Sequence, residues 1–286
     1  MAFSIAAAAR LLRGGPVHPV GADGRMALSD HLRELRARLI RSALFMLVAF
    51  LVALFFFDSP GGGLLGLVME PYNQARIALD QKTQTTAYVA GATGPLMLQL
   101  KLCGVVAIVA SSPYWLYQIW AFVVPGLHAN ERKWSRAFAA VAGPLFIIGV
   151  GTGYYVLPKG LEVLIGFTPA SLQNLVEFGE YFSFLTRMLL VFGISFEIPL
   201  FVIMLNLAGV ISGKQLARYR PWIILGTFIF AAVATPSTDP FSMVMLAGPM
   251  LVLFVVAEIV ARSLDKARGR GAYSTEQWAD DQQSPL

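Results

Sequence analysis

One carboxylate stands out because it lies where a charge is expensive. Glu197 falls inside an apolar stretch, from Arg187 to Asn206, that is long enough to cross a membrane. An acid at that depth costs roughly 2.5 kcal/mol or more, so it is retained where it is neutral, paired or in contact with water inside the protein. A functional role is therefore the default interpretation. The alternative is a protonated Glu197 that bonds to a neighbouring helix and holds the helices together.

Two further acids lie in strongly basic segments next to apolar runs. Glu34 precedes the first run beside a stripe of leucines at helical spacing, and Glu131 follows the second run. A carboxylate accepts two parallel N–H bonds from a guanidinium, a geometry that a lysine ammonium does not reproduce. The two acids are therefore candidates for binding a pair of arginines. The alternative is local pairing, of Glu34 with Arg38 and of Glu131 with Arg132 or Lys133.

The composition is typical of an integral membrane protein. Hydrophobic residues make up 56% of the 286 residues and charged residues only 14%, whereas soluble domains carry about 25% charged residues. A hydrocarbon core about 30 Å thick needs about 20 apolar residues in a helix. Six runs approach or exceed this length: 39–57, 95–124, 137–157, 183–210, the short 221–236, and 241–261.

We therefore expect an all-α membrane protein with six transmembrane helices. The membrane domain should cover residues 26–262, with a disordered extension at 1–25 and a disordered polar tail at 263–286. Basic residues favour one side of the membrane, with seventeen Lys and Arg in one set of loops and termini and three in the other. The positive-inside rule then predicts that both termini are cytoplasmic.

Helix breakers predict the shape of the assembly. Four of the predicted spans contain a proline, at Pro113, Pro144, Pro199 and Pro249. Proline removes a backbone bond and kinks a helix, which favours a curved, open arrangement. The alternative is that membrane helices simply tolerate proline. The pair Gly149 and Gly153 is a weak indication of close helix packing.

The segments on the predicted outer side carry further signals. Apolar patches at 64–69 and 161–167 are expected to form short half-helices at the interface. Lys101 and Arg187 lie one or two turns into their spans and are interpreted as anchors whose charges reach back to the surface. A salt bridge with Glu197 is the alternative for these two cations.

Several ordered motifs carry a resemblance to a known family. They are Ser29-Asp30-His31-Leu32-x-Glu34-Leu35-Arg36-x-Arg38, Met69-Glu70-Pro71-Tyr72, Tyr117-Gln118-x-Trp120-Ala121-Phe122-x-x-Pro125-Gly126-Leu127-x-x-x-Glu131-Arg132, Phe192-Gly193-x-Ser195-Phe196-Glu197-x-Pro199, Arg220-Pro221, and Thr235-Pro236-x-x-Asp239-Pro240-Phe241-Ser242. Together they resemble the TatC family, whose members are the core subunit of the twin-arginine protein translocase. The resemblance runs from about residue 26 to residue 262.

The resemblance implies a signal-peptide receptor in a bacterial cytoplasmic membrane, with a glove-shaped bundle of six helices. Its partners would be twin-arginine signal peptides of folded cargo, single-span TatA/TatB-type subunits and other copies of itself. Export would use the proton-motive force, with no enzymatic activity, cofactor or nucleic acid. By motif, the signal-peptide site would be Glu34, Glu131, Arg36, Phe122, Pro125 and Arg132. Partner contact or transport would involve Glu197, Pro71, Asp239 and Thr235.

Two other classes of protein compete with this interpretation. A proton-coupled secondary transporter would use Glu197 for coupling, but such transporters usually contain repeated halves, and the sequence shows no such symmetry. An intramembrane enzyme would need a recognisable catalytic motif, and no zinc-protease, serine-hydrolase or phosphate-loop pattern occurs. The single cysteine, Cys103, is interpreted as a small buried hydrophobic residue without a disulfide or a metal.

Overall fold

The structure is a computed structural model that describes residues 28–58, 63–79, 85–123, 132–169, 171–172, 174–235 and 240–267. The predicted extension at 1–25 and the tail after residue 267 lie outside these ranges. Most of the described residues are helical. The helices and strands are α2 (Leu28–Phe55), α3 (Gly63–Ala78), β1 (Thr85–Tyr88), α4 (Gly94–Ala110), α5 (Ser112–Val123), α6 (Arg132–Gly166), β2 (Asn174–Glu177), α7 (Phe178–Leu207), α8 (Gly213–Arg218), α9 (Arg220–Ala234) and α10 (Pro240–Ala267).

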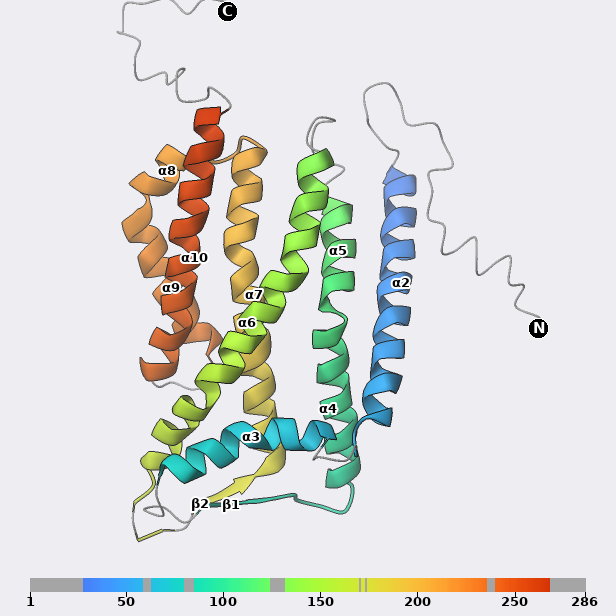
Figure 1. Cartoon of the computed structure of the whole chain (residues 1–286), viewed down its shortest axis with the longest axis vertical. Helices are drawn as coiled ribbons and strands as arrows, with labels where there is room; N and C mark the ends of the chain where they lie inside the picture. The colour runs from blue at the N-terminus through green and yellow to red at the C-terminus, as the bar shows by residue number, and fades with distance from the viewer. Residues whose placement is uncertain are drawn as a thin grey trace, which may run out of the picture.

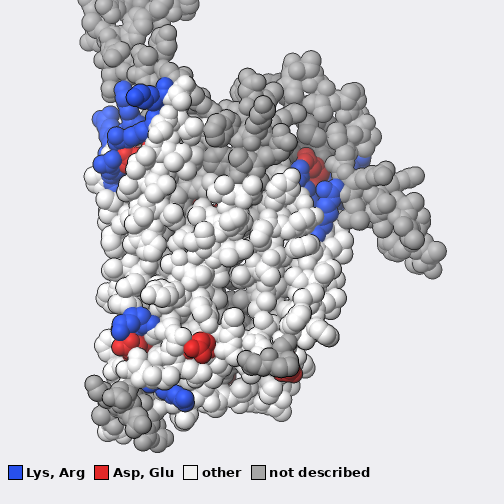
Figure 2. All heavy atoms as spheres, in the orientation of Figure 1, with Lys and Arg blue, Asp and Glu red and all other residues white. Residues whose placement is uncertain are grey.

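The long helices run between two ends of the molecule (Figure 1). We call the upper end in this view, which holds the start of α2 and all of α8, the α8 end. The opposite end, with α3, β1 and β2, is the α3 end. Helix α2 packs on α4 and α5, α5 packs on α6, α6 on α7, and α7 on α10. Charged side chains gather near both ends, and the band between them is almost entirely uncharged on the visible face (Figure 2).

The observed helices only partly match the six predicted spans. Four are long and apolar enough to cross a membrane: Leu32–Phe55, Ala140–Gly166, Phe178–Leu207 and Pro240–Ala267. The pair α4 and α5 makes a fifth if it is counted as one bent span. Helix α9 is apolar but has only 15 residues, which gives about 22 Å at 1.5 Å per residue, less than the hydrocarbon thickness.

The second predicted span is broken rather than kinked. Helices α4 and α5 meet at a bend of 55°, and Pro113 lies in the first turn of α5, not inside a continuous helix as predicted. Proline fits that position because the N–H groups in the first turn of a helix have no hydrogen-bond acceptor within the helix, so the missing N–H costs no bond. Pro144, Pro199 and Pro249 do lie inside helices, as predicted.

Helix α3 is the predicted half-helix of the first outer loop, and Pro71 shapes its contacts. Proline at this position has no N–H to bond the carbonyl of Leu67. That carbonyl instead accepts a hydrogen bond of 2.7 Å from the Tyr154 hydroxyl of α6. The next carbonyl, of Val68, accepts one of 2.6 Å from Tyr181 of α7. The proline therefore helps to fasten α3 across the α3 end of the bundle.

Other features of the α3 end differ from the predictions. The patch 161–167 is not a separate half-helix, because residues up to Gly166 continue α6 without a break. The all-α prediction also missed β1 and β2, which pair in parallel with Thr85 opposite Asn174. At the other end of the chain, α10 continues to Ala267, beyond the domain boundary predicted at residue 262.

Helices α6 and α7 make a close contact at the predicted glycines. A Cβ atom on Gly149 would lie 2.7 Å from the carbonyl oxygen of Phe192, and one on Gly153 would lie 3.1 Å from the Phe192 side chain. The prediction of close packing is therefore confirmed. Cys103 is also buried as predicted, with 0% exposure.

This contact predicts the effect of adding one methyl group to α6. Gly149→Ala must move the α7 backbone, and we expect it to lower the free energy of unfolding by about 1–3 kcal/mol, as overpacking typically does. The matched control is Gly151→Ala in the same helix, where a Cβ atom meets nothing within 4 Å. Thermal unfolding of both variants in one detergent measures the difference. Equal midpoints would contradict the close contact.

Candidate functional site

The candidate peptide site at the α8 end is built around Glu34. Its carboxylate oxygen Oε1 accepts a hydrogen bond of 2.9 Å from Arg38 Nε, one turn later in α2, and a second bond from the same guanidinium. Arg38 also donates a bond of 3.0 Å to Gln118 Oε1 of α5. The pair is partly shielded, since the side chains of Glu34 and Arg38 are 16% and 20% exposed. The local pairing that the sequence left open is thus the contact observed.

The pairing leaves part of the Glu34 carboxylate available. Both bonds from Arg38 end on Oε1, and Oε2 accepts none from any residue that the structure describes. A carboxylate can accept about four hydrogen bonds. The site therefore holds one guanidinium and retains acceptor capacity for another donor.

The other residues predicted for this site are only partly placed. Arg36 is exposed on α2, and Phe122 is half-buried near the end of α5. Arg132 is the first residue of α6, but its side chain is not among those that the structure describes. Glu131 and Pro125 lie outside the described residues. In the described part of the site, Arg38 links Glu34 to Gln118, a residue to which the sequence assigned no role.

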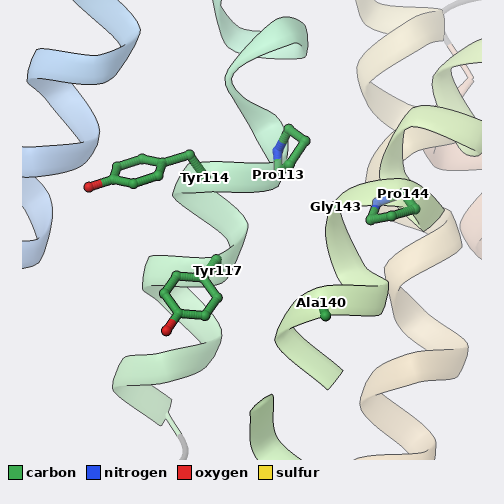
Figure 3. Close-up of a pocket in the computed structure, with 6 residues that line it drawn as sticks. All are labelled: Pro113, Tyr114, Tyr117, Ala140, Gly143 and Pro144. Atoms are coloured by element: carbon green, nitrogen blue, oxygen red, sulfur yellow. The ribbon is translucent and has the colours of Figure 1, made fainter. Parts of the chain in front are cut away.

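A small apolar pocket lies between α5 and α6, and its lining residue Tyr117 directly precedes Gln118 in the chain. It has a volume of about 330 Å³ and is lined by Pro113, Tyr114, Tyr117, Ala140, Gly143 and Pro144 (Figure 3). The helices come together here because a Cβ atom on Gly143 would lie 2.6 Å from the Cα of Pro113. Figure 3 shows Tyr114 pointing from α5 towards α2, where its ring stacks on Phe45 at 4.6 Å.

Glu197 lies near the middle of α7, as the sequence predicted. Both of its carboxylate oxygens are buried, and neither has a hydrogen-bond partner among the described residues. The Trp120 side chain of α5 approaches the carboxylate but makes no hydrogen bond with it. Neither Lys101 nor Arg187 forms an ion pair with it in the described part of the chain. The salt bridge between Glu197 and Lys101 or Arg187, which the sequence left open, is therefore not observed among the described residues.

Pro71 and Thr235, two of the positions predicted for partner contact or transport, make contacts within the fold. Pro71 shapes α3, as described above. Thr235 is buried at the end of α9, where its hydroxyl donates a bond of 2.9 Å to the carbonyl of Ala231. Asp239 lies outside the described residues.

The sequence interpretation missed a second acid at the α8 end. Glu258 of α10 is only 2% exposed and accepts two bonds of 2.6 Å from Arg220. Arg262, one turn later, lies 2.7 Å from the same carboxylate. The sequence did contain a signal for this ion pair, because Glu258 lies within an apolar run and precedes Arg262 by four residues. No cluster of side chains suited to a metal ion occurs in the part of the chain that the structure describes.

Comparison with known proteins identifies the family. The family described as Sec-independent protein translocase protein (TatC) matches residues 30–249. This chain belongs to the TatC family. Among relatives named Sec-independent protein translocase protein TatC, that of Corynebacterium kroppenstedtii is 36% identical, covering 99% of this chain and 72% of the relative. That of Frankia casuarinae is 39% identical, covering 92% and 74%. That of Escherichia coli K12 is 31% identical, covering 85% and 91%.

Solved structures agree with this TatC assignment. A crystal structure of the twin-arginine translocase receptor TatC superimposes with a TM-score of 0.61 and 29% identity, covering 82% of this chain and 98% of that one. A second, in the detergent DDM, gives 0.66 and 30%, covering 81% and 99%. The chain is therefore a multi-pass membrane component of the twin-arginine translocase. It is a transport subunit and not an enzyme.

Proposed function

We propose that this TatC-family chain is the receptor that binds the signal peptides of folded export cargo through their paired arginines. Glu34 and Glu131 would be the two acceptor carboxylates. Export would use the proton-motive force. The observation that carries the proposal is the guanidinium already held by Glu34, since it demonstrates that this half-buried carboxylate accommodates an arginine side chain.

The geometry supports two ways in which a peptide arginine could be bound at Glu34. It could take the vacant Oε2, with Arg38 remaining on Oε1, or it could displace Arg38, which would keep its bond to Gln118. In either case, the reduced exposure strengthens the charge-assisted hydrogen bonds. Arg36, Phe122, Pro125 and Arg132 would shape the same surface. The pocket of Figure 3 is lined by the same helix α5 that carries Gln118.

The site also requires an orientation, which we propose from the distribution of basic residues. The α8 end would face the cytoplasm of a bacterium, with both termini on that side of the inner membrane. Helix α9 would be the sixth span, and the bilayer would thin locally to match its length. The membrane domain would begin near residue 26 and be flanked by disordered termini.

Four residues outside the peptide site would serve partner contact or transport. Glu197 would meet a polar group of a single-span TatA/TatB-type helix, or would draw water into the membrane. Pro71 and Asp239 would act at the outer face, and Thr235 at the end of α9. Helices α9 and α10 would provide the docking face for the small subunits, and other copies of the chain would complete the translocase.

The test of the receptor function uses the unmodified protein with altered peptides. We expect a signal peptide with Arg-Arg to bind about tenfold or more tightly than the same peptide with Lys-Lys, because bonds to a charged group are worth about 1.5–3 kcal/mol and lysine lacks the planar fork. Both peptides have the same net charge, so general attraction to the surface cancels. Binding is measured by fluorescence anisotropy in detergent. Equal affinities would refute the proposal.

A further inference from the structure

A second concave site lies at the α3 end, away from the proposed peptide site. It is a pocket of about 430 Å³ between α4 and α7. Its lining residues are Lys101, Glu177, Gly179, Glu180, Ser183, Phe184 and Arg187. Two cations and two anions therefore face one cavity.

None of these four charges is paired within the described part of the chain. No ion pair or hydrogen bond joins Lys101 or Arg187 to Glu177, Glu180 or any other described side chain. An unpaired cation one or two turns inside a membrane helix is costly, so such residues are normally neutralised by a partner. Both cations are exposed, so they are accessible to a ligand from outside the described chain.

The charges are ordered along the helix axis. Glu177 and Glu180 lie at the beginning of α7, at the α3 end, whereas Arg187 lies two turns beyond Glu180. Lys101 lies about two turns inside α4 from its start at the same end. The acids are thus nearer to the membrane surface and the cations nearer to its centre.

This order matches one type of membrane molecule. A phospholipid with an amine headgroup carries its phosphate next to the acyl chains and its ammonium further out. We propose that the pocket binds the headgroup of a zwitterionic phospholipid of the phosphatidylethanolamine type, with the phosphate on Lys101 and Arg187 and the ammonium on Glu177 and Glu180. The ring of Phe184 would lie beside the start of the acyl chains.

Other ligands would neutralise only two of the four charged residues in the pocket. A lipid without an amine would neutralise the two cations but would place its headgroup against two acids. A carboxylate from a partner helix would likewise leave Glu177 and Glu180 unpaired. The Ser183 hydroxyl does not change this balance, because it already donates a bond of 2.8 Å to the carbonyl of Gly179. Only a ligand with an inner negative and an outer positive charge complements all four residues.

The test is native mass spectrometry of the purified full chain with two lipids that share the same acyl chains. The lipids are palmitoyl-oleoyl phosphatidylethanolamine and palmitoyl-oleoyl phosphatidylglycerol, added at equal concentration. We expect the unmodified chain to retain the ethanolamine lipid preferentially. Arg187→Gln and Lys101→Gln should each lower its apparent affinity by about tenfold, because each removes a charge-assisted contact. Glu180→Gln should reduce or reverse the preference for the ethanolamine lipid.

Lys159→Gln is the matched control. Lys159 is a cation from the same end of the molecule, but it is paired with Glu162 at 2.7 Å outside the pocket, so its removal should leave lipid retention unchanged. If Arg187→Gln fails to fold, as judged by size-exclusion chromatography, Lys101→Gln and Glu180→Gln still decide the question. Equal retention of the two lipids by the unmodified chain, or unchanged retention by the pocket variants, would overturn the proposal. Neither result would affect the receptor function, which is measured by peptide affinity.

Discussion

Glu34→Gln is expected to lower the affinity of this chain for an Arg-Arg signal peptide by about 10- to 100-fold. A charge-assisted hydrogen bond contributes about 1.5–3 kcal/mol, and the neutral amide retains the shape of the side chain but not its charge. The amide also offers one acceptor oxygen where the carboxylate has two, and Arg38 already occupies one oxygen of Glu34. Peptide titrations by fluorescence anisotropy measure the loss.

The fold should survive this change, because Arg38 keeps its hydrogen bond to Gln118 on α5. The matched control is Glu162→Gln, which removes an acid from an ion pair between neighbouring turns of α6. That variant should bind the peptide like the unmodified chain. If Glu34→Gln also binds normally while folding normally, Glu34 is only the local partner of Arg38 and belongs to no peptide site.

Glu197→Leu is expected to raise the stability of the chain while lowering its export activity. The substitution removes two buried oxygens without partners, so it should raise the stability of the isolated chain by about 1–3 kcal/mol, the usual penalty of an unsatisfied buried group. Export should fall by about tenfold, because a polar contact between membrane helices is worth about 1–2 kcal/mol. The measurements are thermal unfolding in detergent and export of a twin-arginine cargo in cells that contain the partner subunits.

Glu197→Gln serves as the control, since it keeps a polar group at the same depth. It should retain more export than Glu197→Leu, and both variants should bind signal peptide like the unmodified chain, because Glu197 belongs to a different site. Normal export by the leucine variant would mean that this acid has no role in transport. Loss of peptide binding in the leucine variant would instead assign Glu197 to the receptor site.

Much of the fold could be predicted from the sequence because a bilayer restricts the choices. A backbone in hydrocarbon must satisfy its own hydrogen bonds, so long apolar runs become helices. The runs around Leu32–Phe55, Phe178–Leu207 and Pro240–Ala267 did so. The close contact at Gly149 was also predictable, because a small residue in a membrane helix lets another backbone approach.

The sequence-based predictions failed where contacts with other segments of the chain, rather than the hydropathy of one segment, determine the structure. The run 95–124 is strongly apolar on both sides of Ser111-Ser112-Pro113, so its hydropathy did not reveal the break between α4 and α5. Strands β1 and β2 are separated by about 85 residues, and their parallel pairing depends on the helices that bring them together. Glu258 was overlooked although Arg262 follows it by four residues, because its other partner, Arg220, lies on a different helix.

The sequence by itself determined the membrane class, the family and the identity of the unusual acids, because these depend on composition and on the order of motifs. Only the tertiary structure decided what those acids contact. Glu34 holds Arg38 with one oxygen, Glu258 is neutralised by two arginines, and Glu197 has no hydrogen-bond partner among the described residues. The reason is physical: spacing alone allows a pair four residues apart, but burial and contacts between helices, such as that of Arg220 with Glu258, depend on how whole helices pack.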